Sequence, residues 1–90
     1  AETYPIYLSE CVPNPAADEF LISFNLIEEA QTTLTIYNLF GTKILTIFDK
    51  VATPETFSIK QDISDLTNGV YIVVLKTPSH NLARILRVVK

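Results

Sequence analysis

The sequence predicts an all-β fold, an antiparallel β-sandwich of about seven short strands. Val, Ile and Thr together supply 27 of the 90 residues, and these β-branched residue types favour pleated strands over helices. No window of about ten residues shows helical periodicity, whereas apolar and polar residues alternate within short segments. Turn-forming residues separate these segments at intervals of about 8–12 residues, which is the spacing typical of a sandwich.

The first ten residues are expected to be a linker that leads into an edge strand. Tyr4, Ile6 and Leu8 share one strand parity, and Pro5 excludes the segment from the middle of a sheet. Since the chain begins with alanine and has no signal peptide, we expect it to be a piece of a longer protein. The domain boundaries are therefore expected at residues 1–10 for the linker and 11–90 for the sandwich.

Residues 11–16 are expected to form a stiff bend, because prolines fix φ at two of these six positions. The side chain of Asn14 in this bend is expected to bond nearby backbone. A strand follows from Phe20, because its apolar residues recur at every second position and predict one buried face. That face consists of Phe20, Ile22, Phe24 and Leu26.

After a turn at residues 28–31, the next strand is expected over residues 32–38. Its inward residues are Leu34 and Ile36, and its outward residues are Thr33, Thr35 and Tyr37. Residues 38–41 are typical of a hairpin loop in which Gly41 supplies a positive φ. The partner strand is expected over residues 43–48, followed by a loop over residues 49–54.

The second half of the chain supplies three more strands. The first is marked by Phe57, Ile59 and Ile63, with Lys60 and Asp62 facing water. After a turn at residues 65–69, residues 70–75 are apolar throughout, which predicts a strand covered on both faces or lying at the centre of a sheet. A turn at residues 77–81 precedes the last strand over residues 82–89.

Leu66, Gly69 and Tyr71 place a tyrosine just inside a strand, directly after a tight turn. In sandwiches such a tyrosine donates its hydroxyl hydrogen to upstream backbone and fixes the corner. The alternative is an ordinary core tyrosine. Neither interpretation makes Tyr71 catalytic.

Charge is distributed unevenly, although the net formal charge is only −3. Residues 1–65 hold all ten acidic residues, whereas residues 66–90 hold four basic residues and no acidic one. One interpretation is a basic final strand that pairs with acidic neighbours. The other is a basic segment that another protein recognises. The net acidic charge argues against a nucleic-acid partner.

Few residues suit catalysis, so we expect no enzyme, no cofactor and no metal. His80, the only histidine, lies beside Ser79, and adjacent residues rarely meet as nucleophile and base. His80 and the single cysteine, Cys11, cannot supply the ligands that zinc needs, and Cys11 is interpreted as a buried thiol. One oxygen-rich turn indicates either calcium binding or ordinary turn chemistry, and its residues are Asp62, Ser64, Asp65 and Asn68.

Four motifs stand in an order that resembles the C-terminal sorting domain of the type IX secretion system, type A, of the Por secretion system family. They are Pro13-Asn14-Pro15-Ala16 before the alternating strand, the segment from Leu34 to Gly41, the segment from Ile63 to Tyr71, and a basic closing strand that ends in lysine. The resemblance covers residues 11–90.

The resemblance implies an immunoglobulin-like sandwich of about seven strands, which agrees with the strand count above. It also implies a non-catalytic signal that directs a cargo protein through the outer-membrane type IX translocon for surface attachment or release. The implied partners are this translocon, a sortase-like protease and the upstream cargo domain. The implied location is the periplasm in transit, then the outer-membrane surface or the extracellular space.

Particular positions match the family's motifs. Those that shape the fold are Asn14, Pro15, Ala16, Gly41, Leu66, Gly69 and Tyr71. The candidates for recognition by the translocon are Arg84, Arg87 and Lys90 of the closing strand. One departure is that Thr42 intervenes before Lys43, where family members often place a lysine soon after the glycine.

Two other hypotheses stand beside this one. The chain is alternatively a non-catalytic binding or spacer module, immunoglobulin-like or fibronectin-like, of a cell-surface enzyme. Separately, an exposed edge at either end of the chain predicts pairing with a second copy as a strand-swapped homodimer.

Overall fold

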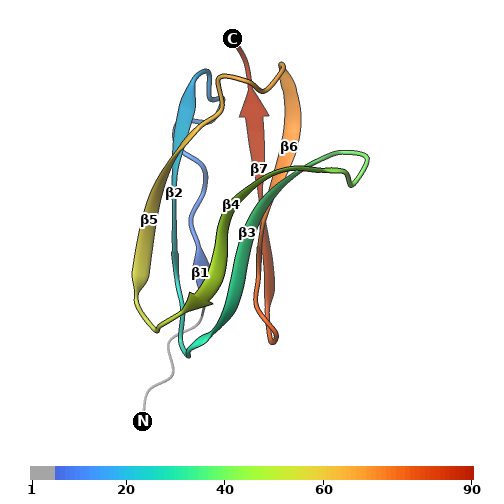
Figure 1. Cartoon of the computed structure of the whole chain (residues 1–90). Coiled ribbons are helices and arrows are strands. Elements are labelled where there is room, and N and C mark those ends of the chain that lie inside the picture. The colour runs from blue at the N-terminus through green and yellow to red at the C-terminus, as the bar shows by residue number, and fades with distance from the viewer. Residues whose placement is uncertain (1–5) are drawn as a thin grey trace.

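The computed structural model describes residues 6–90, which form seven strands and no helix (Figure 1). A three-stranded sheet has the order β1-β2-β5, with β1 (Tyr7–Leu8), β2 (Glu19–Asn25) and β5 (Thr56–Asp62). A four-stranded sheet has the order β4-β3-β6-β7, with β3 (Ala30–Asn38), β4 (Lys43–Ala52), β6 (Gly69–Lys76) and β7 (Asn81–Val88). No helix in residues 6–90 is long and apolar enough to cross a membrane.

The two sheets face each other, and every strand pair is antiparallel, which confirms the predicted sandwich (Figure 1). In constant-type immunoglobulin domains the fourth strand lies in the sheet of the first, second and fifth strands. Here β4 pairs with β3 in the other sheet. The sandwich is therefore immunoglobulin-like but differs from the constant type in the sheet to which its fourth strand belongs. It has three strands in one layer and four in the other.

β1 occupies the edge position predicted for the start of the domain, and it pairs with the end of β2. Leu8 of β1 is buried in the core. The expectations for Tyr4 and Pro5 lie outside the described residues.

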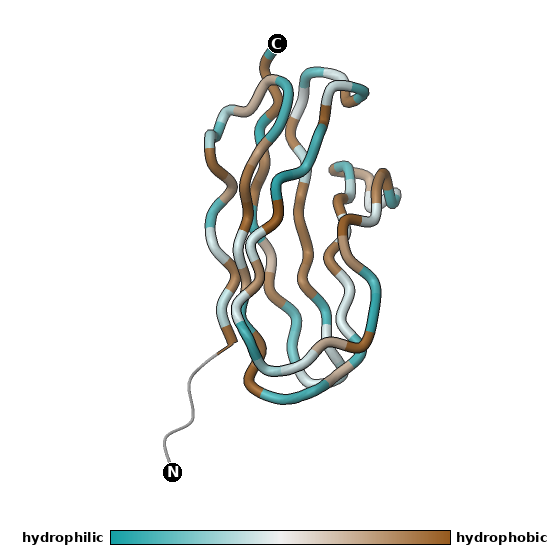
Figure 2. The backbone as a smooth tube through the Cα atoms, turned by 60° about the vertical axis from the view of Figure 1, so that its left-hand side comes forward, coloured by the Kyte–Doolittle hydropathy of each residue, from teal (hydrophilic) through white to brown (hydrophobic). Residues whose placement is uncertain are grey.

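The core lies between the inner faces of the two sheets. Apolar and polar residues alternate along most strands, as the colours along the tube show (Figure 2). The inner face of β2 is the predicted one, because Phe20, Ile22, Phe24 and the following Leu26 are all buried. The four-stranded sheet contributes the buried residues Leu34, Ile36, Tyr71, Val73, Leu75, Leu86 and Val88.

Three phenylalanines join the two sheets on the side where β4 and β5 lie. The ring centroids of Phe24 and Phe57 are 5.0 Å apart in a stacked arrangement, and each ring lies 5.3 Å from the ring of Phe48. Phe48 belongs to β4, so this aromatic contact crosses from one sheet to the other. The ammonium group of Lys50 covers the Phe48 ring at 5.1 Å from its centroid.

The loop predicted over residues 49–54 is wrong for its first four residues, because β4 continues to Ala52. Their partners are the first residues of β3, which begins at Ala30 and therefore two residues earlier than predicted. The side-chain amide of Gln31 also donates to the Asp49 carboxylate at 2.7 Å. Polar residues at 49 and 50 are tolerated in a strand here because backbone pairing with β3 decides the conformation.

The apolar segment 70–75 lies in β6, between β3 and β7, at the centre of its sheet. This confirms the second of the two positions that its composition predicts. Its outer face is not fully covered, because Val70 is exposed and both Ile72 and Val74 are half-buried.

Truncating the aromatic contact should strongly destabilise the domain. We expect Phe24→Ala to lower the free energy of unfolding by about 3–5 kcal/mol, because it removes a buried ring shared by both sheets. Phe40→Ala is the matched control, since that ring is 93% exposed, and we expect a change within about 0.5 kcal/mol. Chemical denaturation measures both. A loss below about 1 kcal/mol for Phe24→Ala would contradict this description of the core.

Candidate functional site

The proline-rich bend before β2 lies along the outer edge of β7. The side-chain amide of Asn14 donates to the Ile85 carbonyl at 2.9 Å, and its oxygen accepts from the Arg87 backbone N–H at 2.9 Å. The backbone of Ala16 continues the contact, donating to the Arg87 carbonyl at 2.7 Å and accepting from the Val89 N–H at 2.9 Å. The bend therefore bonds backbone N–H and C=O groups at the edge of β7, as a neighbouring strand would.

These contacts correct the expectation for Asn14, whose side chain bonds backbone 71 and 73 residues away rather than nearby. Ala16 is fully buried and forms a parallel bridge with Val88, so a larger side chain would meet the core. Pro15 links the two and follows a cis peptide bond.

The hairpin between β3 and β4 is held by the side chain of Asn38. Its oxygen accepts from the backbone N–H groups of Phe40 at 2.9 Å and Thr42 at 3.0 Å. Gly41 has φ of +85°, in the left-handed region that favours glycine. This closed loop directs Leu39 and Phe40 into solvent, where they are 64% and 93% exposed.

Tyr71 makes the contact expected of a tyrosine corner. Its hydroxyl donates to the backbone carbonyl of Thr67 at 2.8 Å and lies 3.2 Å from the Thr67 hydroxyl. The ring is buried, and Leu66 of the same turn packs against the core. Gly69 begins β6 opposite Val88, so the corner lies beside the end of β7.

Arg84 of β7 contacts the main chain of β1 rather than an acidic residue. Its Nε donates to the Leu8 carbonyl at 2.9 Å, and the side chain is half-buried. Because β1 and β7 belong to different sheets, this charged hydrogen bond joins the two layers at their edge.

Lys90 lies two residues beyond the end of β7 and binds the turn after β5. Its ammonium group donates to the carbonyls of Ile63 at 3.2 Å and Ser64 at 2.5 Å, and its backbone N–H donates to the Asn68 side chain at 2.9 Å. The ammonium group of Lys90 is therefore the cation that this oxygen-rich turn binds.

The same turn shows ordinary turn chemistry at Asp62. Its carboxylate accepts from the Ser64 backbone N–H at 2.8 Å, and the hydrogen bonds from Ser64 hold the pKa of Asp62 below its usual value. Within residues 6–90 there is no cluster of three or more His, Cys, Asp or Glu side chains that could hold a metal ion. The calcium interpretation of this turn therefore gains no support.

Arg87 differs from the other two basic candidates. Its side chain is exposed on the outer face of the four-stranded sheet, where it lies opposite Val70. Among the described residues the recorded ion pair joins Lys60 and Glu19, 3.6 Å apart, and none involves the closing segment. The interpretation that this segment pairs with acidic neighbours therefore has no ion pair in its favour within residues 6–90, since Arg84 and Lys90 bind carbonyl groups. Beside the hydrogen bonds from Ser64, the charge of Lys90 nevertheless contributes to lowering the pKa of Asp62.

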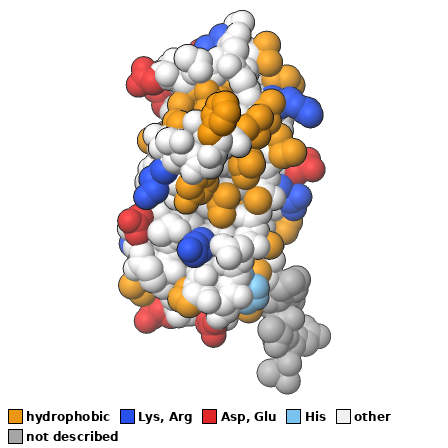
Figure 3. Space-filling model, turned by 90° about the vertical axis from the view of Figure 1, so that its right-hand side faces the viewer, with side chains coloured by type: hydrophobic (Ala, Val, Ile, Leu, Met, Phe, Trp, Pro, Cys, Tyr) orange, Lys and Arg blue, Asp and Glu red, His pale blue; other side chains and the backbone are white. Residues whose placement is uncertain are grey.

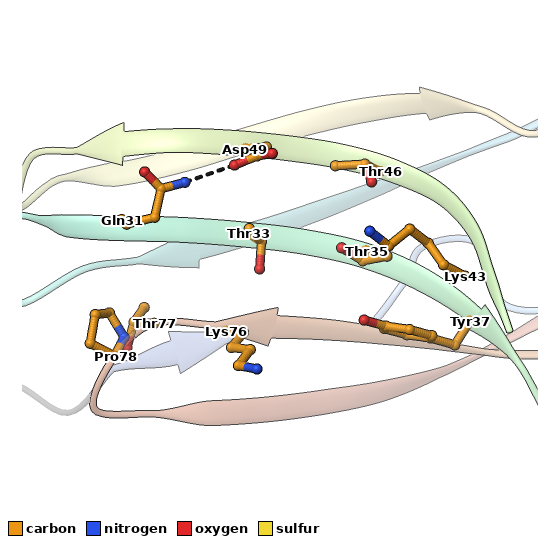
Figure 4. A pocket seen from close by; sticks show the side chains of 10 residues that line it. All are labelled: Gln31, Thr33, Thr35, Tyr37, Lys43, Thr46, Asp49, Lys76, Thr77 and Pro78. Atoms are coloured by element: carbon orange, nitrogen blue, oxygen red, sulfur yellow. Dashed lines mark hydrogen bonds between the residues drawn. The ribbon is translucent and has the colours of Figure 1, made fainter. Parts of the chain in front are cut away.

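A polar groove of about 410 Å³ opens on the outer face of β3 and β4 (Figure 4). Its floor includes the predicted outward residues Thr33, Thr35 and Tyr37, and Lys43 and Lys76 stand on its two sides. No histidine or cysteine of the described residues lines this groove.

Cys11 is buried and forms no disulfide in the described structure, which confirms its interpretation as a buried thiol. Burial raises the pKa of the Cys11 thiol to about 11, and the nearby positive charge of Arg84 opposes this effect in part. A thiol that stays protonated is a poor nucleophile, so burial disfavours reactions of Cys11 at neutral pH.

A known protein family matches most of the chain. The model of a family described as the secretion system C-terminal sorting domain matches residues 10–88. That range runs from the proline-rich bend to the end of β7. No curated protein and no solved structure matches the chain.

Removing the Asn14 side chain should loosen β7. We expect Asn14→Ala to lower the free energy of unfolding by about 1–3 kcal/mol, because two hydrogen bonds to β7 are lost. Asn81→Ala, at the exposed start of the same strand, is the control and should change stability by no more than about 0.5 kcal/mol. Equal effects of the two substitutions in urea denaturation would contradict the role given to Asn14.

The two arginines of β7 should differ in their effect on stability. Arg84→Met keeps an unbranched apolar stem but removes the donor to Leu8, so we expect a loss of about 1.5–3 kcal/mol. Arg87→Met should change the unfolding free energy by less than about 0.5 kcal/mol, because that side chain is exposed. The prediction fails if thermal or urea unfolding ranks the two variants the other way.

The buried thiol makes stability depend on pH in the alkaline range. Below pH 9 the Cys11 thiol is neutral in both states; between pH 9 and 11 the unfolded chain loses the proton while the folded domain keeps it. We therefore expect the unfolding free energy to fall by about 2–3 kcal/mol more across this range in the wild type than in Cys11→Ala. If the unfolding free energies of the two proteins fell equally across this pH range, the effect of burial on the Cys11 thiol would be contradicted.

Proposed function

The chain belongs to the secretion system C-terminal sorting domain family. We propose that β7, which carries Arg87 on its exposed face, is part of the surface that the outer-membrane translocon binds. As a member of that family it is a sorting signal for type IX secretion, and it directs its cargo to the cell surface or the extracellular space. The match over residues 10–88 carries this conclusion, because it includes the bend and the strands from β2 to β7.

We propose the following route for the cargo. A cargo domain upstream of residues 1–10 passes through the periplasm together with the sorting domain, for which we propose residues 11–90 and the edge strand β1 that precedes them. The translocon in the outer membrane then binds the sandwich, and a sortase-like protease separates it from the cargo, which is released or attached at the surface. The strand-swapped homodimer is a separate hypothesis that this route does not need.

The domain is proposed to act by binding alone. The family consists of sorting signals and is not known as a family of enzymes. The alternative of a binding or spacer module on a surface enzyme has no observation in its favour.

Among the three basic candidates, we assign recognition to Arg87. Arg84 and Lys90 bind backbone carbonyls within the domain, so their charges are already used to hold β7 in place. The guanidinium of Arg87 projects from the exposed face, while its backbone is fixed by Asn14 and Ala16. An exposed charge on a fixed strand suits recognition through charge complementarity.

The remaining motif residues are proposed to shape the fold. Asn14, Pro15 and Ala16 form the bend that holds β7. The hairpin depends on Gly41, and the corner before β6 depends on its three motif residues, which are Leu66, Gly69 and Tyr71.

Export of a reporter tests the proposal. Residues 1–90 are fused behind a fluorescent protein that carries a leader, in a strain with a working type IX system. We expect the fusion to reach the surface or the medium, and Arg87→Gln to lower its exported fraction about five- to tenfold through weaker charge complementarity. Lys60→Gln is the matched control, because Lys60 is an exposed base on the other sheet. Retention of the wild-type fusion inside the cell would overturn the proposed function. Equal export of the Arg87→Gln and Lys60→Gln fusions would show that Arg87 has no role in recognition.

A further inference from the structure

An apolar surface lies on the outer face of β6 and β7, beside the β3–β4 hairpin. We call it the hairpin patch, and its residues are Leu39, Phe40, Val70, Ile72 and Ile85. Val70 is 38% exposed and Ile85 is 54% exposed, in addition to the two hairpin residues described above. The space-filling view shows hydrophobic side chains gathered in the upper half of this face (Figure 3).

The strand register makes the patch continuous. Ile72 of β6 lies opposite Tyr37 of β3 on one side and opposite Ile85 of β7 on the other, so one row of side chains crosses three strands. In the next row Val70 lies opposite Arg87, which places a positive charge at the margin of the apolar surface. Further along the outer face of the same sheet, the apolar surface ends and the polar groove begins.

The hairpin is built to keep its apolar side chains outside the core. Asn38 closes the loop with two hydrogen bonds, and Gly41 supplies the backbone conformation that the loop needs. Phe40 is therefore held in solvent on a preformed loop, where binding would order little additional chain. Exposed aromatic side chains on fixed elements are typical centres of protein interfaces.

We propose that the hairpin patch is a docking site for an apolar protein surface with an acidic rim on the type IX export machinery. This inference rests on the proposed function and names the surface that the machinery contacts. Charge complementarity selects the partner, because Arg87 borders the patch and residues 66–90 contain no acidic residue. Truncation of a central aromatic anchor usually weakens an interface more than loss of a charge at its margin.

The same charges argue against two other occupants. A second copy docked patch to patch around a two-fold axis would bring one Arg87 near the other without an acidic partner from the patch. An anionic lipid surface is typically recognised by a cluster of about four to eight basic residues, whereas the strand row that borders the patch supplies one, Arg87. A protein partner with carboxylates around an apolar centre would pair with the charge of Arg87 and cover the exposed apolar side chains of the hairpin patch.

The reporter fusion also tests this surface. We expect Phe40→Ser and Ile85→Ser each to lower the exported fraction about tenfold or more, as truncation of interface anchors does. Leu21→Ser is the matched control, because Leu21 is a 45% exposed residue on the outer face of the other sheet, and its export should equal that of the wild type. All three purified variants should retain the wild-type urea midpoint, which separates lost recognition from lost folding.

Competition provides a second measurement of binding. Excess isolated domain, residues 1–90 behind a leader, should reduce export of a wild-type reporter fusion by occupying the machinery. The domain with Phe40→Ser should reduce it about tenfold less effectively at equal periplasmic amount, whereas the Leu21→Ser domain should compete like the wild type.

The outcomes separate this inference from the function beneath it. If the wild-type fusion is not exported, the proposed function fails. If it is exported and the Phe40→Ser and Ile85→Ser fusions are exported equally well, only the docking site is overturned. Binding of the purified domain to phosphatidylglycerol vesicles that is lost in Phe40→Ser would overturn it in favour of a lipid surface. A dimer in light scattering that Ile85→Ser dissociates would overturn it in favour of a second copy.

Discussion

Within residues 6–90 no strand pairs with the outer edge of β7, and the rest of the structure depends on which groups bond the backbone N–H and C=O groups of that edge. Backbone groups at a sheet edge must find partners or remain open to pairing with another chain. Here the side chain of Asn14 and the backbone of Ala16 provide those partners from the other end of the chain. The contact closes the sandwich between its first and last segments, so β7 is fixed without a further strand.

The three basic candidates of the closing segment differ in whether their charges are bonded within the domain. Arg84 and Lys90 donate to carbonyls of β1 and of the turn after β5, so their charges stabilise the fold. Arg87 keeps its charge on the exposed face, beside the apolar side chains of β6 and the hairpin. A charged and apolar surface on a fixed sheet offers a partner a preformed target, which lowers the entropic cost of binding.

Local patterns predicted most of the fold, and distant contacts account for the errors. Alternation identified β2, and the spacing of Leu66 to Tyr71 identified the corner, because the hydroxyl of Tyr71 reaches a carbonyl only four residues away. The extension of β4 was missed, since its end is set by pairing with the start of β3 rather than by its own polar sequence. The roles of Asn14 and Arg84 were equally inaccessible, because their partners lie more than 70 residues away and no periodicity reports such contacts.

Native-state hydrogen exchange of the wild-type domain at the edge of β7 tests this account most directly. The backbone N–H groups of Arg87 and Val89 are bonded to Asn14 and Ala16, so the account predicts that they exchange as slowly as the central amides of β6. Exchange of these two amides at the rate of an open loop, while β6 stays protected, would contradict it. In that case β7 would not be held by the bend, and the surface that carries Arg87 would not be a fixed one.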